Sequence, residues 1–205
     1  MKSHPYADAP RLPDTSPLDP RLLVGAGSSP VELEIGPGRG GFLVESLMRD
    51  SRLRMVGLEV RRKWASVVDQ RLHGMGLADR GRVFAADARL AIPKLVDSSL
   101  SVVYIHFPDP WWKKRHQKRL VLGAALVDEL SRVIVPGGEL FVQTDVLDRA
   151  SAYETLVAQC PAFEAWSGSP RIVENPRQVQ SPRERRAMAD GLPIVRLRWR
   201  RRSEG

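Results

Sequence analysis

A short apolar strand leads into a glycine-rich turn and then a helix in the sequence Val31-Glu32-Leu33-Glu34-Ile35-Gly36-Pro37-Gly38-Arg39-Gly40-Gly41. Glycines between a strand and a helix permit a tight bend and let a ligand approach the backbone. A Gly-x-Gly-x-Gly pattern is weak evidence on its own, because short glycine motifs recur in many unrelated turns. Gly36 and Gly38 are therefore candidate cofactor-binding positions whose support must come from the rest of the chain.

Strand-like and helix-like stretches alternate downstream of this turn. The predicted strands cover residues 31–35, 54–58, 82–86, 100–105 and 139–144, followed by two more at 163–167 and 193–200. The predicted helices cover 40–49, 61–76, 88–96, 119–134 and 150–159, and Pro136-Gly137-Gly138 is expected to end the fourth of them. This alternation predicts an α/β fold, with a parallel sheet covered by helices on both faces.

Acidic residues stand at the ends of the first three predicted strands: Glu34, Glu59 and Asp87. Ligands of open α/β sheets bind beyond the carboxyl ends of the strands. Glu59 follows the glycine turn by about 20 residues, where an acid can accept hydrogen bonds from both ribose hydroxyls. Asp87 can accept one from an adenine amino group. Each acid taken alone fits a solvated strand end or a helix cap equally well.

The position of Glu34 helps to distinguish between nucleotide cofactors. A carboxylate directly before the first glycine would repel a pyrophosphate but attract a sulfonium and an ammonium group. The sign of this interaction favours S-adenosylmethionine over a dinucleotide. A Rossmann dehydrogenase is disfavoured for the same reason.

A second distinctive stretch follows the fourth predicted strand: Ile105-His106-Phe107-Pro108-Asp109-Pro110-Trp111-Trp112-Lys113-Lys114-Arg115-His116-Gln117-Lys118-Arg119. Asp109 lies between two prolines, which exclude a helix there. Its carboxylate can accept hydrogen bonds from a base edge, the tryptophans can stack, and the cations can neutralise phosphates. Pro-Asp-Pro alone is often only a turn, and a basic run is often only a solvated face. Their combination at a strand end favours binding of one base of a polyanion.

The composition is that of a globular protein with an anionic partner. The chain has 205 residues and a net charge of 32 − 24 = +8, which favours nucleic acid and would also suit an acidic membrane. No apolar run reaches membrane-spanning length, and no N-terminal targeting pattern is present. The single cysteine, Cys160, suits a reducing cytosol, so a cytoplasmic location is expected. The histidines and the cysteine show no metal-ligand spacing, and we predict no metal site.

The two ends of the chain differ from the middle. Residues 1–30 are rich in proline and are expected to form a flexible arm. Residues 31–205 are expected to form one domain, with a mobile, arginine-rich substrate loop at 170–190. Residues 171–202 hold ten arginines against Glu174, Glu184 and Asp190, so this part of the chain is strongly cationic.

Together these stretches resemble the bacterial tRNA (guanine-N7-)-methyltransferases over about residues 31–160, with a weaker match to the C-terminus. The matching positions are Glu34-Ile35-Gly36-x-Gly38-x-Gly40, Gly57-Leu58-Glu59-Val60, Asp87-Ala88, Phe107-Pro108-Asp109-Pro110-Trp111-x-Lys113-Lys114-Arg115-His116-x-Lys118-Arg119, Pro136-Gly137-Gly138 and Thr144-Asp145. The resemblance implies a Rossmann-like class I methyltransferase fold with a mostly parallel seven-stranded sheet. It also implies transfer of a methyl group from S-adenosylmethionine to N7 of guanine 46 in the variable loop of tRNA.

The resemblance also suggests roles for individual residues. Glu34, Gly36, Gly38, Glu59 and Asp87 look like cofactor contacts. Asp109 looks like the catalytic or guanine-orienting acid and also like a cofactor contact. Lys113 and Asp145 look like substrate contacts. It leaves open whether the protein is a monomer or a homodimer.

This chain departs from the family pattern at two places. Trp112 stands where the family usually has proline. The late substrate motif Thr-Lys-Phe-Glu-x-Arg-Gly appears here as Ser181-Pro182-Arg183-Glu184-Arg185-Arg186-Ala187, so Ser181 and Glu184 remain the candidate substrate contacts. The altered motif keeps two alternatives open: a related methyltransferase acting on another RNA or a small molecule, and a non-catalytic RNA-binding relative.

Overall fold

The structure, a computed structural model, describes residues 6–25, 31–108 and 121–203. Among these residues eight strands form one sheet: β1 (Val31–Ile35), β2 (Met55–Glu59), β3 (Gly81–Ala85), β4 (Leu100–His106), β5 (Ile134–Thr144), β6 (Phe163–Ala165), β7 (Arg171–Ile172) and β8 (Val195–Arg201). The strand order is β3-β2-β1-β4-β5-β8-β6, and β7 pairs with β8 beside this path. β1 to β5 are parallel, whereas β8 is antiparallel to its neighbours. The predicted mostly parallel seven-stranded sheet is confirmed, with the two-residue β7 as an addition.

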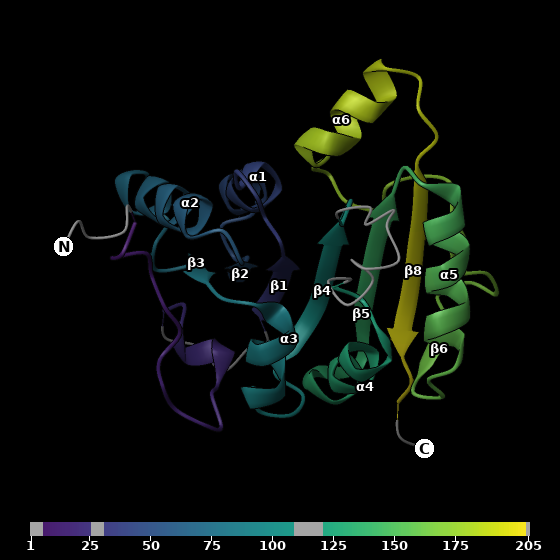
Figure 1. Ribbon diagram of the computed structural model, residues 1–205, viewed down its shortest axis with the longest axis horizontal. Coiled ribbons are helices and arrows are strands. Elements are labelled where there is room, and N and C mark those ends of the chain that lie inside the picture. Colours follow the sequence, from purple (N-terminus) through teal and green to yellow (C-terminus); the bar gives the residue numbers. More distant parts are fainter. Residues whose placement is uncertain (1–5, 26–30, 109–120, 204–205) are drawn as a thin grey trace.

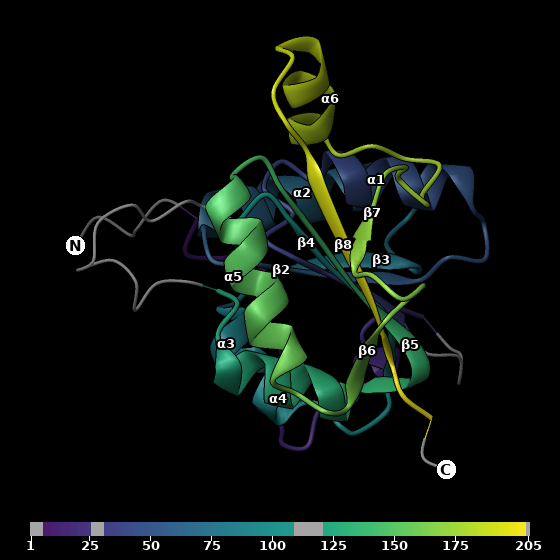
Figure 2. The same ribbon diagram turned by 90° about the vertical axis from the view of Figure 1, so that its right-hand side faces the viewer.

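Helices cover both faces of the sheet (Figure 1 and Figure 2). One face carries α1 (Gly41–Arg49) and α2 (Arg62–Gly74), and the other carries α3 (Ala88–Ala91), α4 (Ala124–Val133) and α5 (Leu147–Ala158). Two short 3-10 helices, η1 (Pro20–Leu22) and η2 (Ile92–Lys94), complete that second side, and α6 (Pro182–Ala189) stands beyond the edge of the sheet. None of the described helices combines the length and the apolar character needed to cross a membrane.

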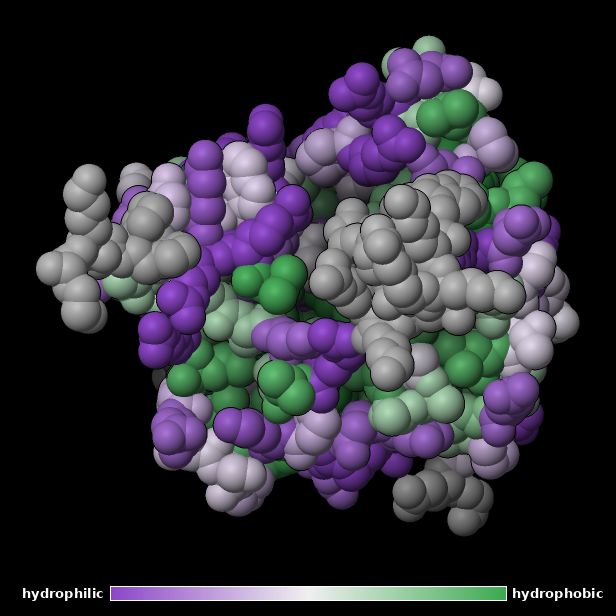
Figure 3. Space-filling model, viewed as in Figure 1, coloured by the Kyte–Doolittle hydropathy of each residue, from purple (hydrophilic) through white to green (hydrophobic). Residues whose placement is uncertain are grey.

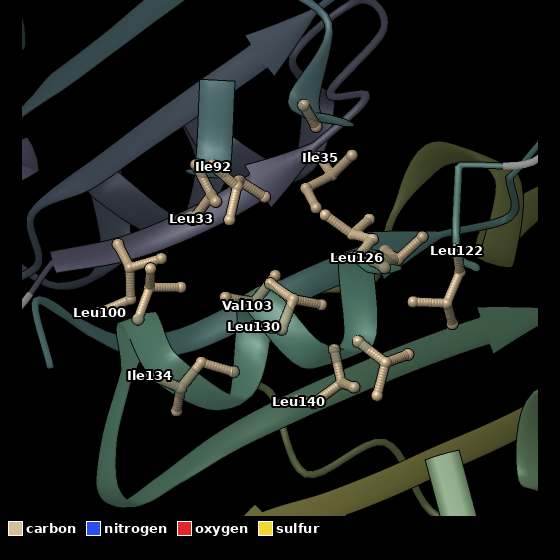
Figure 4. Close-up of a cluster of buried hydrophobic side chains, with 14 of the residues drawn as sticks. Leu33, Ile35, Ile92, Leu100, Val103, Leu122, Leu126, Leu130, Ile134 and Leu140 are labelled. Atoms are coloured by element: carbon tan, nitrogen blue, oxygen red, sulfur yellow. The ribbon is translucent and has the colours of Figure 1, made fainter. Parts of the chain in front are cut away.

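The larger core lies between the sheet and the helices α3 to α5 (Figure 4). On α4 the buried side chains are Leu126, Val127, Leu130 and Val133, which recur at the spacing of one helix face. They pack against strand residues such as Val103, which is completely buried. The central strands are therefore apolar on this side along their whole length, as expected for parallel strands covered by helices.

The turn after β1 requires glycine for steric reasons. Gly36, Gly38 and Gly40 have φ values of 73°, 57° and 71°, which lie in the left-handed region. A Cβ atom on Gly40 would lie only 2.4 Å from Val68 Cγ1 of α2. Glycine thus allows α1 to start directly beside α2. The predicted tight turn is confirmed, and it brings two helix N-termini to the carboxyl edge of the sheet.

The N-terminal segment 6–25 differs from the flexible arm expected from its prolines. Leu18 and Val24 are buried in the main core. The Pro10 carbonyl accepts a hydrogen bond from the Ala85 amide at 2.7 Å, and Leu18 forms a parallel bridge with Leu95. The prolines limit regular structure to the short helix η1 without preventing packing, and scattered apolar side chains anchor the segment along the edge of the domain.

The stretch 170–190 also differs from the expected long loop, because it contains β7 and α6. Ser181 caps α6: its hydroxyl accepts a hydrogen bond from the Glu184 amide at 3.1 Å, and Pro182 occupies the first turn. Serine followed three residues later by glutamate is the sequence pattern of a capping box, and proline is favoured at that first position. This helix start was not predicted, because the polar, arginine-rich composition of the stretch indicated a loop.

Candidate active site

Two adjoining cavities open at the carboxyl edge of the sheet. The larger, of about 880 Å³, lies between the turn after β1 and the starts of α5 and α6. The smaller, of about 410 Å³, lies against the ends of β1, β2 and β3. Both are lined by Gly36, Arg61, His106, Phe107 and Pro108. Two ligands held in the two cavities would therefore meet at the end of β4.

Glu59 lines the smaller cavity and fixes the glycine turn. Its side chain is only 1% exposed, and its Oε2 accepts a hydrogen bond from the Gly38 amide at 2.9 Å. Its Oε1 accepts from the Arg61 backbone amide at 2.9 Å and from Arg61 Nε at 3.1 Å. A carboxylate offers about four acceptor positions. Three of these positions are occupied, so Glu59 can hold the turn and still accept about one hydrogen bond from a ligand hydroxyl.

Glu34 lines the larger cavity, and one of its two carboxylate oxygens is buried without a hydrogen-bond partner among the described residues. Its side chain is 3% exposed, and its Oε1 lies 3.0 Å from Nδ1 of His106, whose side chain is 6% exposed. Its Oε2 has no hydrogen-bond partner among the described residues. A buried carboxylate oxygen without a donor is unfavourable unless a ligand provides one. An ammonium group bound in the larger cavity would donate the missing hydrogen bond to this carboxylate.

Asp87 forms the third acidic position. It caps α3, and its carboxylate accepts hydrogen bonds from the Arg89 amide at 3.0 Å and from Arg89 Nη2 at 2.6 Å. These hydrogen bonds from Arg89 lower the pKa of the Asp87 carboxyl, so the group stays ionised. Beside it, Val60 is 68% exposed and lines the same cavity, where it offers an apolar surface to a ring. The smaller cavity thus fits an adenosine group.

The opposite wall of the larger cavity holds Asp145, directly after β5. Its carboxylate forms an ion pair with the guanidinium of Arg183 on α6, and both residues line the cavity. This contact links the end of the sheet to α6. Local sequence patterns could not predict this pairing, because the two residues lie 38 positions apart.

The two candidate substrate contacts at the start of α6, Ser181 and Glu184, lie in different surroundings: Ser181 lines the larger cavity, whereas Glu184 is buried. Ser181 lines the larger cavity as the cap of α6. Glu184 is completely buried, and its Oε1 accepts hydrogen bonds from Arg196 Nε and Nη2 at 2.9 and 2.8 Å, while its Oε2 accepts from Asn175 Nδ2 at 2.8 Å. In this structure Glu184 therefore anchors α6 to β8 and does not line either cavity. Any effect it has on substrate binding acts through α6.

Asp109 and Lys113 lie outside the described residues. The chain reaches them through Phe107, whose φ is 46°, and Pro108, both of which line the two cavities. A left-handed conformation at a phenylalanine is strained, and such strain is concentrated at functional sites. His106, for which the sequence pattern predicted no role, contacts Glu34 from the neighbouring strand. Among the described residues no group of three or more His, Cys, Asp or Glu side chains could hold a metal ion.

Comparison with known proteins agrees with this geometry. Residues 28–197 match the family described as "Putative methyltransferase". The tRNA (guanine-N(7)-)-methyltransferase of Myxococcus xanthus is 36% identical over 83% of this chain and 83% of its own length. The enzyme of the same name from Anaeromyxobacter dehalogenans is 37% identical over 93% of this chain and 94% of its own length.

A solved structure supports the fold independently. The geranyl diphosphate C-methyltransferase of Streptomyces coelicolor, in complex with S-adenosyl-L-homocysteine, superposes with a TM-score of 0.57. The match has 13% sequence identity and covers 88% of this chain and 75% of that one. The class I methyltransferase fold is thereby confirmed. Together with the matches to the two bacterial enzymes, these findings show that the chain belongs to the tRNA (guanine-N7-)-methyltransferase family.

Proposed function

We propose that this protein transfers the methyl group of S-adenosylmethionine to N7 of guanine 46 in the variable loop of tRNA. The observation that carries the proposal is the meeting of two cavities at the end of β4, one lined by Glu59 and Asp87 and the other by Asp145 and Arg183. The names of the bacterial relatives supply the substrate class. The resemblance of the Phe107 to Arg119 stretch supplies the position on tRNA.

The described residues fit the proposed cofactor. When bound, S-adenosylmethionine supplies an activated methyl group on a sulfonium. Glu59 and Asp87 would hold the adenosine part in the smaller cavity, where Glu59 also keeps the Gly36 and Gly38 turn in place. The partnerless Oε2 of Glu34 would accept a hydrogen bond from the ammonium group.

The acceptor needs little chemical activation. Guanine N7 carries an exposed lone pair, so no general base is required, and the task of the protein is to align donor and acceptor. Positive charge moves onto the guanine ring during transfer. A carboxylate nearby stabilises that charge, and we assign this role to Asp109, which follows Pro108 at the junction of the two cavities. Lys113, Asp145 and Ser181 are assigned to the RNA side.

The variant Glu34→Gln is expected to bind S-adenosylmethionine about 10- to 100-fold more weakly than the wild type. Glutamine keeps the size of the side chain but removes the charge, and a hydrogen bond to a charged group contributes about 1.5–3 kcal/mol. Isothermal titration calorimetry measures this affinity. Asp128→Asn, at an exposed position of α4, is the matched control. Equal affinities of all three proteins would remove Glu34 from the cofactor site.

The function itself is tested by incubating the protein with unmodified tRNA and S-adenosylmethionine labelled in the methyl group. Nucleoside analysis is expected to place the label in 7-methylguanosine, and a tRNA with adenine at position 46 is expected to gain none. Label at another nucleotide would refute the position. Label in no RNA would refute the proposal as a whole and favour a small-molecule substrate or a non-catalytic relative.

A further inference from the structure

Three cations close to the larger cavity form a surface that the proposed roles above do not use. Arg39 lies in the turn after β1 and lines the cavity. Arg62 and Lys63 line neither cavity, but they begin α2 directly after Arg61, which lines both. All three side chains are exposed. We call Arg39, Arg62 and Lys63 the basic edge.

The charges of the basic edge are not neutralised within the part of the chain that the structure describes. None of the three side chains has a carboxylate partner there. The arginines of α6 differ, because Arg183, Arg185 and Arg186 form ion pairs with Asp145, Glu45 and Asp190, respectively. Of these two described surfaces, the basic edge therefore carries the larger unbalanced positive charge.

The placement of these cations works against the stability of the helix that carries two of them. The N-terminus of a helix is the positive end of its dipole and favours acidic side chains. The first turn of α2 has no acidic residue, and Arg61 before it provides no side-chain cap. Arg61, Arg62 and Lys63 place three consecutive positive charges at this positive end, which destabilises the start of α2. Such a local conflict is expected where a function requires it.

The indole of Trp64 holds part of the basic edge in position. The guanidinium carbon of Arg39 lies 4.8 Å from the ring centroid, and the Lys63 ammonium lies 5.2 Å from it. Cation–π contacts of this kind restrict long basic side chains without removing their charge. The two cations are thus held in place and remain available to an external anion.

The basic edge and α6 border the same opening. Arg39 and Arg183 line the same cavity, and the start of α6 touches the start of α1, since a Cβ on Gly41 would lie 2.3 Å from Pro182 Cγ. Figure 3 shows hydrophilic side chains gathered over α2 and over α6 on this face. A chain with regularly spaced negative charges that enters the cavity with one base would pass the basic edge.

We propose that the basic edge binds the phosphodiester backbone of the RNA substrate next to the nucleotide that enters the cavity. This inference rests on the proposed function. It adds a second RNA contact surface, on the side of the glycine turn after β1, to the one assigned to Lys113, Asp145 and Ser181. Phosphate contacts fix the position of a nucleic acid without reading its sequence. The basic edge therefore sets affinity and alignment, and the base itself is recognised inside the cavity.

The test compares the triple variant Arg39→Ala, Arg62→Ala and Lys63→Ala with the wild type. Binding of unmodified tRNA is measured by fluorescence anisotropy at several salt concentrations, and methyl transfer is measured on the same proteins. The triple variant is expected to bind tRNA at least about ten-fold more weakly, and the slope of log affinity against log salt is expected to fall by about one for each cation that contacts a phosphate. Its affinity for S-adenosylmethionine is expected to stay unchanged.

Two matched variants separate a charge effect at this surface from other effects. Arg71→Ala removes one exposed cation from the other end of α2, about 13 Å further along the helix, and should leave affinity and slope unchanged. The exchange of Arg62→Lys and Lys63→Arg keeps the charge and should preserve binding. Unchanged affinity and slope in the triple variant, or equal losses in Arg71→Ala, would overturn the inference. A wild-type protein that methylates no tRNA would refute the proposed function instead.

Discussion

Replacing Asp109 with alanine is expected to abolish methyl transfer to RNA while S-adenosylmethionine still binds. Asp109 follows Pro108, which lines both cavities where they meet. Loss of a charge placed next to the acceptor removes stabilisation that matters mainly in the transition state, and we expect the rate to fall at least about 100-fold. Transfer of a labelled methyl group under single-turnover conditions measures the chemical step, and calorimetry measures cofactor affinity.

The variant Asp109→Asn distinguishes charge from shape at this position. Asparagine keeps one carbonyl acceptor but loses the negative charge. If charge stabilisation is the main contribution, Asp109→Asn should be nearly as slow as Asp109→Ala. Recovery in Asp109→Asn would assign the residue to hydrogen bonding of the base instead. Normal turnover in Asp109→Ala would remove Asp109 from the mechanism.

The variant Glu184→Ala is expected to lower the free energy of unfolding by about 3–5 kcal/mol. Glu184 is completely buried, and its carboxylate is the ion-pair partner of Arg196, whose side chain is only 12% exposed. Removing one partner of a buried pair leaves the other charge without compensation. The same change deprives Asn175 Nδ2 of an acceptor at 2.8 Å. Urea unfolding followed by circular dichroism measures the difference.

Two controls test whether the buried pair is the cause. Arg186→Ala changes an exposed side chain on the same helix and should shift the free energy of unfolding by no more than about 0.5 kcal/mol. Arg196→Ala should cost much less in the Glu184→Ala background than in the wild type, because the two residues are coupled. Additive effects of the two substitutions would contradict the assignment.

The local sequence predicted the framework of this protein well. The alternation of strands and helices, the glycine turn after β1 and the acids Glu34, Glu59 and Asp87 at strand ends are all found at the expected places. Each depends on a short pattern: side-chain periodicity, backbone freedom of glycine, or a residue next to an apolar run. Element boundaries differed by a few residues, and β5 starts at Ile134 and includes Pro136-Gly137-Gly138.

The tertiary structure alone decided which partners these residues have. The contact of Glu34 with His106 joins neighbouring strands that are 72 positions apart, and the ion pair of Asp145 with Arg183 joins β5 to α6. The anchoring of α6 by Glu184, and the packing of residues 6–25, likewise depend on surfaces that form only when distant segments meet. Composition and periodicity describe a segment by itself, whereas burial and pairing are properties of two segments. The sequence by itself therefore determined the sheet and the acidic residues at its strand ends, and the tertiary contacts determined the shape of the cavities and the charges left exposed beside them.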